Sequence, residues 1–368
     1  MNIRKSGAKY SAIVGIGEQL RQKSKETGRE YLYLNRGVNA VTNINLSEII
    51  PLIDFNSNDI QVYPPNNGRP GLRNAINDYY FQSSTSPDNI FITNGGMGGL
   101  DLIIKTLDVE KIFISKYYWG AYTNIMKINH TPFEAYSDFE YLNSNIDKLK
   151  DCAVIICDPN NPVGDKHDDK KLLDLVGKLN DKGVIVIWDS PYRLLFADKS
   201  DTLYKRLLQF ENVIISESFS KSLGLSGQRI GFVHTTNKEY NSEFNTNLLY
   251  ATNGINAFAQ ILVEKLLSTE EGLKASKAFR DETVKGIADN IKYLDERKLL
   301  ASEFYSHSKP IGIFVIVNKS FDQLLEHKIG SVSLSFFTQE NKEAAAKYAR
   351  ICVSVSHEKF KTFFDAIK

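Results

Sequence analysis

The stretch that decides the fold is SFSKSLGLSGQRIG, which occupies residues 218–231. It follows a short apolar run at residues 213–216, which is typical of a buried strand. Within it, Lys221 lies close to two serines and, after a glycine-containing turn, to an arginine. Hydroxyl and guanidinium groups bind phosphate, and a lysine amine forms a Schiff base with a carbonyl group. By itself an S-x-S-K segment usually forms a solvated turn, but Arg229 eight residues after Lys221 and Gly231 two residues beyond it favour a lysine beside a phosphate site.

Five more short apolar runs have the pattern of strands that are buried on both faces, as parallel sheets require. Polar segments with helical spacing lie between them, for example at residues 99–107 and 170–179. This alternation predicts an α/β fold with a large, doubly wound, mainly parallel sheet. The five apolar runs occupy residues 90–93, 112–115, 153–157, 184–188 and 230–234.

After about residue 255 the pattern changes to long, charged, amphipathic helices, at residues 257–267 and 271–297. A predicted strand at residues 312–318 and a closing helix at residues 359–367 complete the chain. We therefore expect two domains. The large domain would contain residues 41–275, and a second, smaller α+β domain would combine residues 1–40 with residues 276–368.

The charge and the cysteine content argue against several classes of protein. Forty-five basic and 44 acidic residues give a net charge of +1, which supplies no general attraction for nucleic acid or an anionic membrane. No apolar run approaches the ~18 residues that span a bilayer, and six scattered histidines without HxxxH spacing predict no metal site. Cys152, Cys157 and Cys352 lack CxxC spacing, so we expect buried thiols and a cytoplasmic protein.

Two further motifs follow predicted strands, at the position where ligands collect in open parallel sheets. DPNNPVG at residues 158–164 contains Asn161 and is, by itself, a signal for a turn. WDSPY at residues 188–192 contains Asp189 and Tyr192. On local pattern alone, Asp189 fits a helix cap equally well.

A glycine-rich segment, NGGMGGL at residues 94–100, follows one predicted strand and opens a helix. Backbone N–H groups at a helix N-terminus bind phosphate, and glycines let the backbone approach closely. The spacing is not G-x-G-x-x-G, so the segment is not a dinucleotide-binding fingerprint. It predicts phosphate binding through the backbone of Gly95, Gly96 and Met97.

Taken in order from Tyr63 to Arg350, these motifs resemble those of the class I/II family of pyridoxal-phosphate (PLP) enzymes, the aspartate-aminotransferase type. The three segments around Lys221, Asn161 and Asp189 are similar to the family's S-x-S-K with R-x-G, N-P-x-N-P-T-G and D-x-x-Y elements. The resemblance covers most of the chain. It implies the aspartate-aminotransferase-like fold, fold type I, an enzyme activity on an amino acid and PLP as cofactor.

The resemblance implies a role for each motif residue. Lys221 would hold PLP as a Schiff base and act as general base at the substrate α-carbon, while Asp189 would face the ring nitrogen. Asn161 and Tyr192 would contact the phenolic oxygen of PLP. Trp119, in YYWGAY at residues 117–122, would stack on the ring. The implied phosphate-binding residues are Gly95, Gly96, Met97, Ser218, Ser220 and Arg229.

Other residues extend the implied site. Tyr63 resembles the tyrosine that reaches the phosphate of the neighbouring subunit, which implies a homodimer with shared active sites. Arg350, in RICVS at residues 350–354, resembles the arginine that pairs bidentately with the substrate α-carboxylate. Gly37 and Asn161 are further candidates for substrate binding.

The sequence departs from the family pattern at several positions. Asp158 and Val163 stand where Asn and Thr are usual, and residues 329–339 lack the usual P-G-x-x-F. Because that last segment borders the substrate in relatives, elimination or cyclisation, as in C–S lyases or capreomycidine-synthase-like enzymes, stays an alternative to transamination. A PLP-sensing regulator or a non-catalytic binding module is a remote alternative, since the 62 residues before Tyr63 leave little room for a DNA-binding helix-turn-helix.

The substrate class follows from a missing charge. Relatives that act on dicarboxylic acids bind the distal carboxylate with an arginine from the neighbouring subunit, just before a segment that resembles TNGINAFAQ at residues 252–260. Here that segment is preceded by NLLY at residues 247–250, without Arg or Lys. Burying an unpaired carboxylate is costly. We therefore expect a substrate with an apolar, aromatic or basic side chain, and not aspartate.

Overall fold

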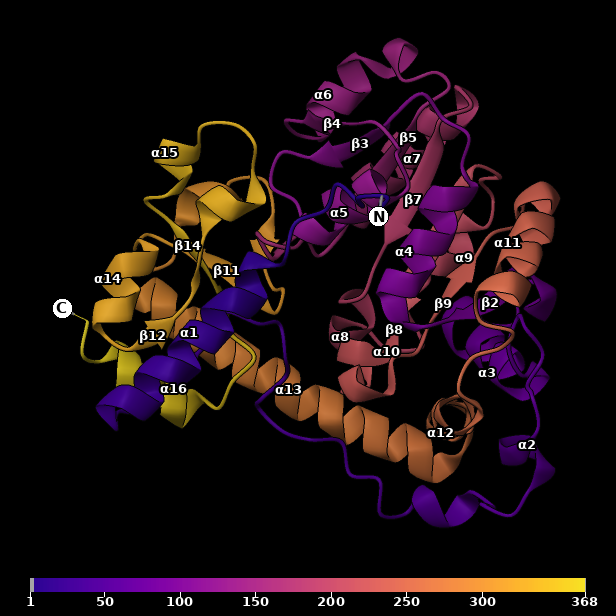
Figure 1. The fold of residues 1–368 in the computed structure, drawn as a ribbon, viewed down its shortest axis with the longest axis horizontal. Coiled ribbons are helices and arrows are strands. Elements are labelled where there is room, and N and C mark those ends of the chain that lie inside the picture. The colour runs from indigo at the N-terminus through magenta and orange to yellow at the C-terminus, as the bar shows by residue number, and fades with distance from the viewer. Residues whose placement is uncertain (1–2, 368) are drawn as a thin grey trace.

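A seven-stranded sheet forms the centre of the larger part of the computed structural model, which describes residues 3–367 (Figure 1). Six strands run in the same direction, and β9 alone is antiparallel to its two neighbours. The predicted doubly wound, mainly parallel sheet is therefore confirmed. The strand order is β2 (Ile90–Thr93), β9 (Gly231–His234), β8 (Val213–Ser218), β7 (Ile185–Asp189), β5 (Ala153–Cys157), β3 (Ile112–Ser115) and β4 (Phe133–Tyr136).

Every residue of the central strands β5 and β8 is buried, because helices cover both faces of the sheet. Val154 and Ile156 pack into one apolar core with helices α3 (Pro70–Phe81), α7 (Asp169–Asp181) and α12 (Ala257–Ser268). Ala153 and Ile155 point to the opposite face and pack with α4 (Gly95–Thr106), α5 (Gly120–Ile128) and α11 (Lys238–Ala251). This alternation explains why the strands are continuous apolar runs in the sequence.

A smaller part of the structure is built around a three-stranded antiparallel sheet (Figure 1). Its order is β11 (Phe314–Val317), β14 (Ala349–Cys352) and β13 (Val332–Ser333). Helices α1 (Ala12–Thr27), α14 (Phe321–Glu326) and α16 (His357–Phe364) lie around it. The 27-residue helix α13 (Glu270–Glu296) runs from α12 beside the large sheet to this smaller part. The boundaries at residues 40 and 275 stay a prediction.

Two short strand pairs tie distant segments together. β1 (Leu32–Tyr33) is parallel to β12 (Ile329–Gly330), and β6 (Asp165–Lys166) is antiparallel to β10 (Lys309–Pro310). The second pair brings the loop after β5 against the smaller part. The remaining helices are short: α2 (Asn58–Gln61), α6 (Phe139–Ser144), α8 (Arg193–Phe196), α9 (Leu203–Leu207), α10 (Phe219–Ser222) and α15 (Lys342–Ala345).

Two general expectations meet the structure at this level. Cys152, Cys157 and Cys352 are buried free thiols, as expected. Within residues 3–367, no helix is long and apolar enough to cross a membrane.

Candidate active site

The three strands that precede the main motifs lie side by side. Cys157 at the end of β5 is aligned with Asp189 at the end of β7, and Asp189 is aligned with Ser216 of β8. Carboxyl ends of neighbouring parallel strands open at the same edge of the sheet. The loops that carry Asn161, Asp189 and Lys221 therefore meet at one edge.

Lys221 lies in α10, a single helical turn that begins directly after β8 because Ser218 caps it by accepting a hydrogen bond from the Ser220 backbone N–H. The Lys221 amine donates a hydrogen bond to the carbonyl oxygen of Gly37, which belongs to the segment after β1. Desolvation lowers the pKa of Lys221 to about 8, and the positive charge of Arg229 acts in the same direction. A lysine with this pKa supplies a neutral, nucleophilic amine near neutral pH.

A small cradle lies beside Lys221 at the N-terminus of α4. A Cβ atom on Gly95 would lie 2.8 Å from Arg229 Nη2, and one on Gly96 would lie 3.3 Å from Ser218 Cβ. Gly95 also has a φ of +68°, a conformation that favours glycine. The Ser218 hydroxyl donates to the Ser220 hydroxyl at 3.0 Å. A helix N-terminus, a guanidinium and two hydroxyls thus surround a space suited to phosphate.

Asp189 is a buried carboxyl group at the end of β7. The Tyr122 hydroxyl donates a hydrogen bond to it, and burial raises the pKa of Asp189 to about 7. Tyr122 was not predicted as a site residue. It lies one helical turn after Trp119 on α5, and the two rings pack edge to face with centroids 5.7 Å apart. Its spacing of three residues from Trp119 is the only feature of the sequence that could have indicated Tyr122 as a site residue.

Asn161, Tyr192 and Arg350 form a chain of side chains. The Asn161 amide donates to the Tyr192 hydroxyl at 3.1 Å, and Arg350 Nη1 donates to Asn161 Oδ1 at 3.2 Å. Arg350 also donates to the carbonyl oxygen of Asn35. Residues more than 180 positions apart in the sequence therefore meet at this point.

Arg350 is a buried cation between two aromatic rings. Its guanidinium lies 4.1 Å from the centroid of Phe314 and 4.7 Å from that of Phe337. Burial lowers the pKa of Arg350 to about 10, and its Nε has no hydrogen-bond partner within residues 3–367. Such a group retains a donor for an incoming anion.

The atypical segment at residues 329–339 does reach the site. It forms β12, β13 and a short 3₁₀ turn at Leu334–Phe337. Phe337 flanks Arg350, and its carbonyl oxygen accepts a hydrogen bond from the backbone N–H of Tyr118. Sequence reasoning missed Phe337 as a site residue, because the segment lacks the expected motif.

Not every predicted residue converges on this centre. Tyr63 lies on the surface and is 84% exposed, and Met97, in the first turn of α4, is 47% exposed. Trp119 is partly buried and caps the N-terminus of α5. Gly37 meets Lys221 only through its carbonyl oxygen. A Cβ at Gly37 would lie 2.3 Å from Phe314, so glycine is required there by close packing.

These groups fit pyridoxal phosphate. Lys221 offers an amine for the aldehyde, Asp189 offers a carboxyl group for the ring nitrogen, and the Gly95 cradle offers donors for the phosphate. Asp189 is buried without a cationic partner among the described residues, which suits pairing with a protonated ring nitrogen.

Comparison with known proteins agrees with this geometry. A family model described as aminotransferase class I and II matches residues 34–367. A histidinol-phosphate aminotransferase of Thermoanaerobacter sp. (strain X514) is 26% identical over 295 residues, which cover 77% of this chain and 74% of that protein. An aspartate aminotransferase of Pyrococcus horikoshii is 26% identical over 235 residues, which cover 60% and 59%.

Solved structures share the fold. The aspartate aminotransferase of Thermus thermophilus with maleate superposes with a TM-score of 0.81 at 17% identity, covering 99% of this chain and 98% of that one. An aminotransferase from Mycobacterium tuberculosis gives a TM-score of 0.81 at 15% identity, covering 99% and 97%. The expected aspartate-aminotransferase-like architecture is therefore confirmed.

Proposed function

The chain belongs to the class I and II aminotransferase family, whose members depend on PLP, and from this premise we propose that it transfers the amino group of a non-dicarboxylic amino acid to a keto acid. The observation that carries the proposal is the convergence of Lys221, Asp189 and Arg350 at one edge of the large sheet. Each of these residues has a separate task in such a reaction.

Lys221 is proposed as the residue that binds the cofactor and moves the proton at the substrate α-carbon. Bound PLP supplies an aldehyde that takes up the amino group and a ring that withdraws electrons from the α-carbon. Because the pKa of Lys221 is lowered to about 8, its amine is available as a general base close to neutral pH. The hydrogen bond to the Gly37 carbonyl oxygen supports a fixed position for this amine.

Asp189, Asn161 and Tyr192 are proposed to hold the cofactor ring. Tyr122 orients the Asp189 carboxyl group, so that it keeps the ring nitrogen protonated. Asn161 and Tyr192 are joined at 3.1 Å and would present their polar atoms to the phenolic oxygen. Trp119 is proposed to stack on the ring from the N-terminus of α5.

Ser218, Ser220, Arg229 and the first turn of α4 are proposed to bind the phosphate. The close approach of Gly95 to Arg229 and of Gly96 to Ser218 supports this assignment, because it leaves backbone N–H groups and side-chain donors around one space. Met97 would contribute through its backbone, since its side chain is largely exposed.

Arg350 is proposed to bind the α-carboxylate of the substrate. Its free Nε and its position on β14 beside Asn161 support this role, and Asn161 would share the contact. The cation is held between Phe314 and Phe337, which fixes the guanidinium plane for a bidentate contact.

The proposed substrate has an apolar, aromatic or basic side chain. No basic residue occurs at residues 247–250, where relatives that act on dicarboxylic acids supply a second arginine. Phe314 and Phe337 flank Arg350 with apolar surface. Such surroundings favour an apolar side chain over a second carboxylate.

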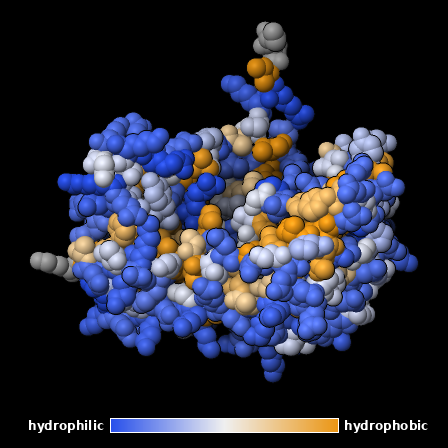
Figure 2. Space-filling model, turned by 90° about the horizontal axis from the view of Figure 1, so that it is seen from below, coloured by the Kyte–Doolittle hydropathy of each residue, from blue (hydrophilic) through white to orange (hydrophobic). Residues whose placement is uncertain are grey.

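We also propose a homodimer, a cytoplasmic location and the division into residues 41–275 and the two terminal segments. Exposed apolar side chains gather on one face of the large part, and Figure 2 shows a broad hydrophobic patch on the right of that view. A patch of this kind is typical of a protein–protein interface. Exposed large apolar or aromatic residues of the predicted large domain include Leu52, Phe55, Val62, Tyr63, Leu249 and Tyr250.

The test is a panel of amino acids incubated with the PLP-loaded protein and a keto acid, with keto-acid formation and ammonia release measured separately. Keto acid without ammonia is expected from neutral and basic amino acids. Ammonia as the main product would instead support elimination, which the atypical segment at residues 329–339 keeps as the second candidate. A kcat/KM for aspartate as high as for every other amino acid would contradict the proposed substrate class. Light scattering at assay concentration tests the dimer, which a fully active monomer would refute.

A further inference from the structure

A group of charged residues lies behind the loop that carries Asn161. Asp158 follows β5 and is completely buried. Its Oδ2 lies 2.8 Å from the Lys166 amine, and its Oδ1 accepts a hydrogen bond of 2.8 Å from the backbone N–H of His167. The His167 ring contributes a second contact, with Nδ1 at 3.2 Å from the same oxygen. Asp158 therefore has a cation beside Oδ2, which accepts no hydrogen bond within residues 3–367, and a hydrogen-bond donor at Oδ1.

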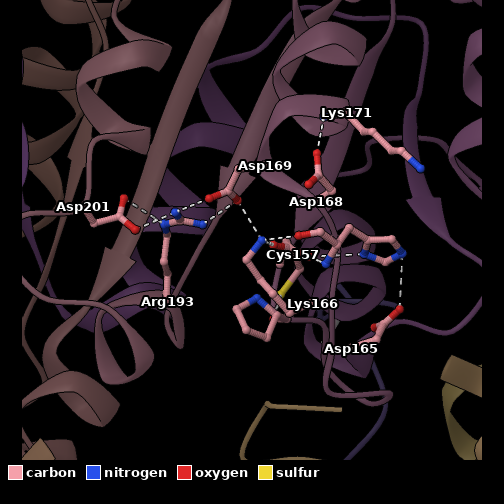
Figure 3. Close-up of polar contacts among 11 residues, drawn as sticks. Cys157, Asp165, Lys166, Asp168, Asp169, Lys171, Arg193 and Asp201 are labelled. Atoms are coloured by element: carbon pink, nitrogen blue, oxygen red, sulfur yellow. Dashed lines mark hydrogen bonds and ion pairs between the residues drawn. The ribbon is translucent and has the colours of Figure 1, made fainter. Parts of the chain in front are cut away.

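The contacts continue from Lys166 to the other loop of the site. The Lys166 amine lies 2.7 Å from Asp169 Oδ1. Arg193 donates to both oxygens of Asp169, at 2.9 and 2.7 Å, and its Nη2 lies 2.6 Å from Asp201. Figure 3 shows Arg193 held between Asp169 and Asp201, with Lys166 reaching toward Asp169. We call Asp158, Lys166, Asp169, Arg193 and Asp201 the rear ionic chain.

Two members of the rear ionic chain lie close in sequence to Asn161 and Tyr192, the two residues proposed to contact the cofactor. Asp158 is three residues before Asn161, and Arg193 directly follows Tyr192. In front, the side chains of Asn161 and Tyr192 meet at 3.1 Å. The same two loops are thus joined twice, once by this contact and once by the ionic chain behind it.

We propose that Lys166 and Asp169 are positioning residues that fix the distance between Asn161 and Tyr192, and that they act only through these two loops. The inference rests on the proposed function, because it assigns Asn161 and Tyr192 to the phenolic oxygen of PLP. Hydrogen bonds to that oxygen set the pKa of the linkage between PLP and Lys221. Outer contacts of this kind orient the groups that touch a cofactor and tune its chemistry.

The burial and geometry of the chain support this role. Arg193 contacts Asp169 with two parallel hydrogen bonds, which fix orientation as well as distance. Burial raises the pKa of Asp169, but hydrogen bonds from Arg193 and Lys166 outweigh it and lower the pKa to about 2. Asp169 is therefore ionised near neutral pH and keeps its contacts with Arg193 and Lys166 there.

The loop after β5 has further ties that transmit the position of Asp158 to Asn161. The backbone N–H of Asn160 donates to the carbonyl oxygen of Asp165 at 3.1 Å, and the Asn160 side chain accepts from the Val163 N–H at 3.1 Å. These contacts close the loop into one turn. A shift at Lys166, next to Asp165, therefore moves Asn161 with it.

The experiment compares Lys166→Met with a matched control, Lys178→Met, in the PLP-loaded protein. Lys178 pairs with Asp174 at 3.0 Å on the same helix α7 as Asp169, but both side chains are at least half exposed and neither touches the two loops. The readout is the pH midpoint of the visible absorption change of bound PLP. We expect Lys166→Met to shift this midpoint by roughly half a unit or more, and Lys178→Met to leave it in place.

A second variant guards against simple loss of folding. Lys166→Met leaves the buried carboxylate of Asp158 without its lysine partner, whereas Asp158→Asn/Lys166→Met removes that charge and keeps an acceptor for the His167 N–H. The double variant is expected to fold and still to show the shifted midpoint. Lys166→Arg keeps the cation, so we expect it to show the midpoint of the unaltered protein.

The outcomes separate the two proposals. If the unaltered protein takes up PLP and the folded Lys166→Met or double variant shows the original midpoint, the positioning role is wrong and the chain only stabilises the fold. If the unaltered protein forms no absorbing adduct with PLP, the proposed function fails, and the positioning role fails with it.

Discussion

Buried or partly buried charges lie both in front of and behind the loops after β5 and β7, and the two groups differ in their partners. In front, Lys221, Asp189 and Arg350 have no ion pair within residues 3–367. Burial lowers the pKa of the two cations and raises that of Asp189, so it favours the neutral form of each group. At the rear, Asp158 and Arg193 are held by charges of opposite sign at 2.6–2.8 Å. Burial alone therefore does not mark a functional site in this protein. A functional site is marked by buried charges that lack a partner of opposite charge, because such a charge is costly unless a bound ligand pairs with it.

The largest expected effect comes from the front. Lys221→Ala removes both the amine that binds PLP and the general base, so we expect keto-acid formation to fall by about 10⁴-fold. The variant should also show no adduct that borohydride reduces. Absorption spectra and mass analysis of the reduced protein check this. A reducible adduct in Lys221→Ala would place the cofactor lysine elsewhere.

The second largest effect is expected in the rear ionic chain, where a substitution should lower the stability of the fold. Arg193→Leu leaves Asp169 and Asp201 with one partner fewer in a largely buried position, which we expect to lower the free energy of unfolding by about 3–5 kcal/mol. Urea unfolding measures it. Arg206→Leu on α9, an exposed position, is the control and should change stability by less than about 0.5 kcal/mol. Equal losses in both variants would remove the distinction between front and rear.

Arg350→Ala is expected to lower activity toward every amino-acid substrate. Each amino-acid substrate would lose a charged hydrogen-bonded contact worth about 2–3 kcal/mol, which lowers kcat/KM roughly 30- to 150-fold. The substitution also removes packing against Phe314 and Phe337 and leaves the acceptors on Asn161 and Asn35 without their donor, so we expect the free energy of unfolding to fall as well. Steady-state kinetics of the variant measure the loss of kcat/KM, and urea unfolding of the same sample measures the change in stability. An unchanged kcat/KM for every substrate would show that another residue binds the α-carboxylate.

The smallest effect is expected at Glu217. This residue is buried on β8 without a cation, like the front charges, but it accepts hydrogen bonds from Tyr204 and from the Ser218 N–H. Burial raises the pKa of Glu217 to about 8. Between its ordinary value near 4.5 and 8, the folded state holds a proton that the unfolded state lacks, so stability falls as pH rises through this window. Glu217→Gln should therefore gain about 1–2 kcal/mol relative to the unaltered protein at pH 9.

Urea unfolding at pH 4.5 and pH 9 checks this sign. The advantage of Glu217→Gln should shrink as pH falls, because the unaltered carboxyl group then becomes neutral in both states. A stability difference that is the same at both values would mean that Glu217 is ionised in the fold.

The sequence determined the groups whose neighbours lie close along the chain. Lys221 follows β8 after three residues, and Ser218, Ser220 and Arg229 belong to the same strand–turn segment, so this segment and its family resemblance together predicted a phosphate site. Alternating apolar runs likewise predicted the parallel sheet, since strands buried on both faces tolerate only apolar residues. Asp189 was recognised by resemblance, although its local pattern fitted a helix cap equally well.

Only the tertiary structure decided which distant side chains complete these groups. The bond from Tyr122 to Asp189, the contact of Gly37 with Lys221 and the place of Phe337 beside Arg350 depend on how separate elements pack. Asp158 stood out in the sequence as a departure from the family pattern, but its partners became visible only in the fold. The physical reason is that side-chain contacts between distant segments arise from the packing of whole helices and sheets, which no local spacing encodes.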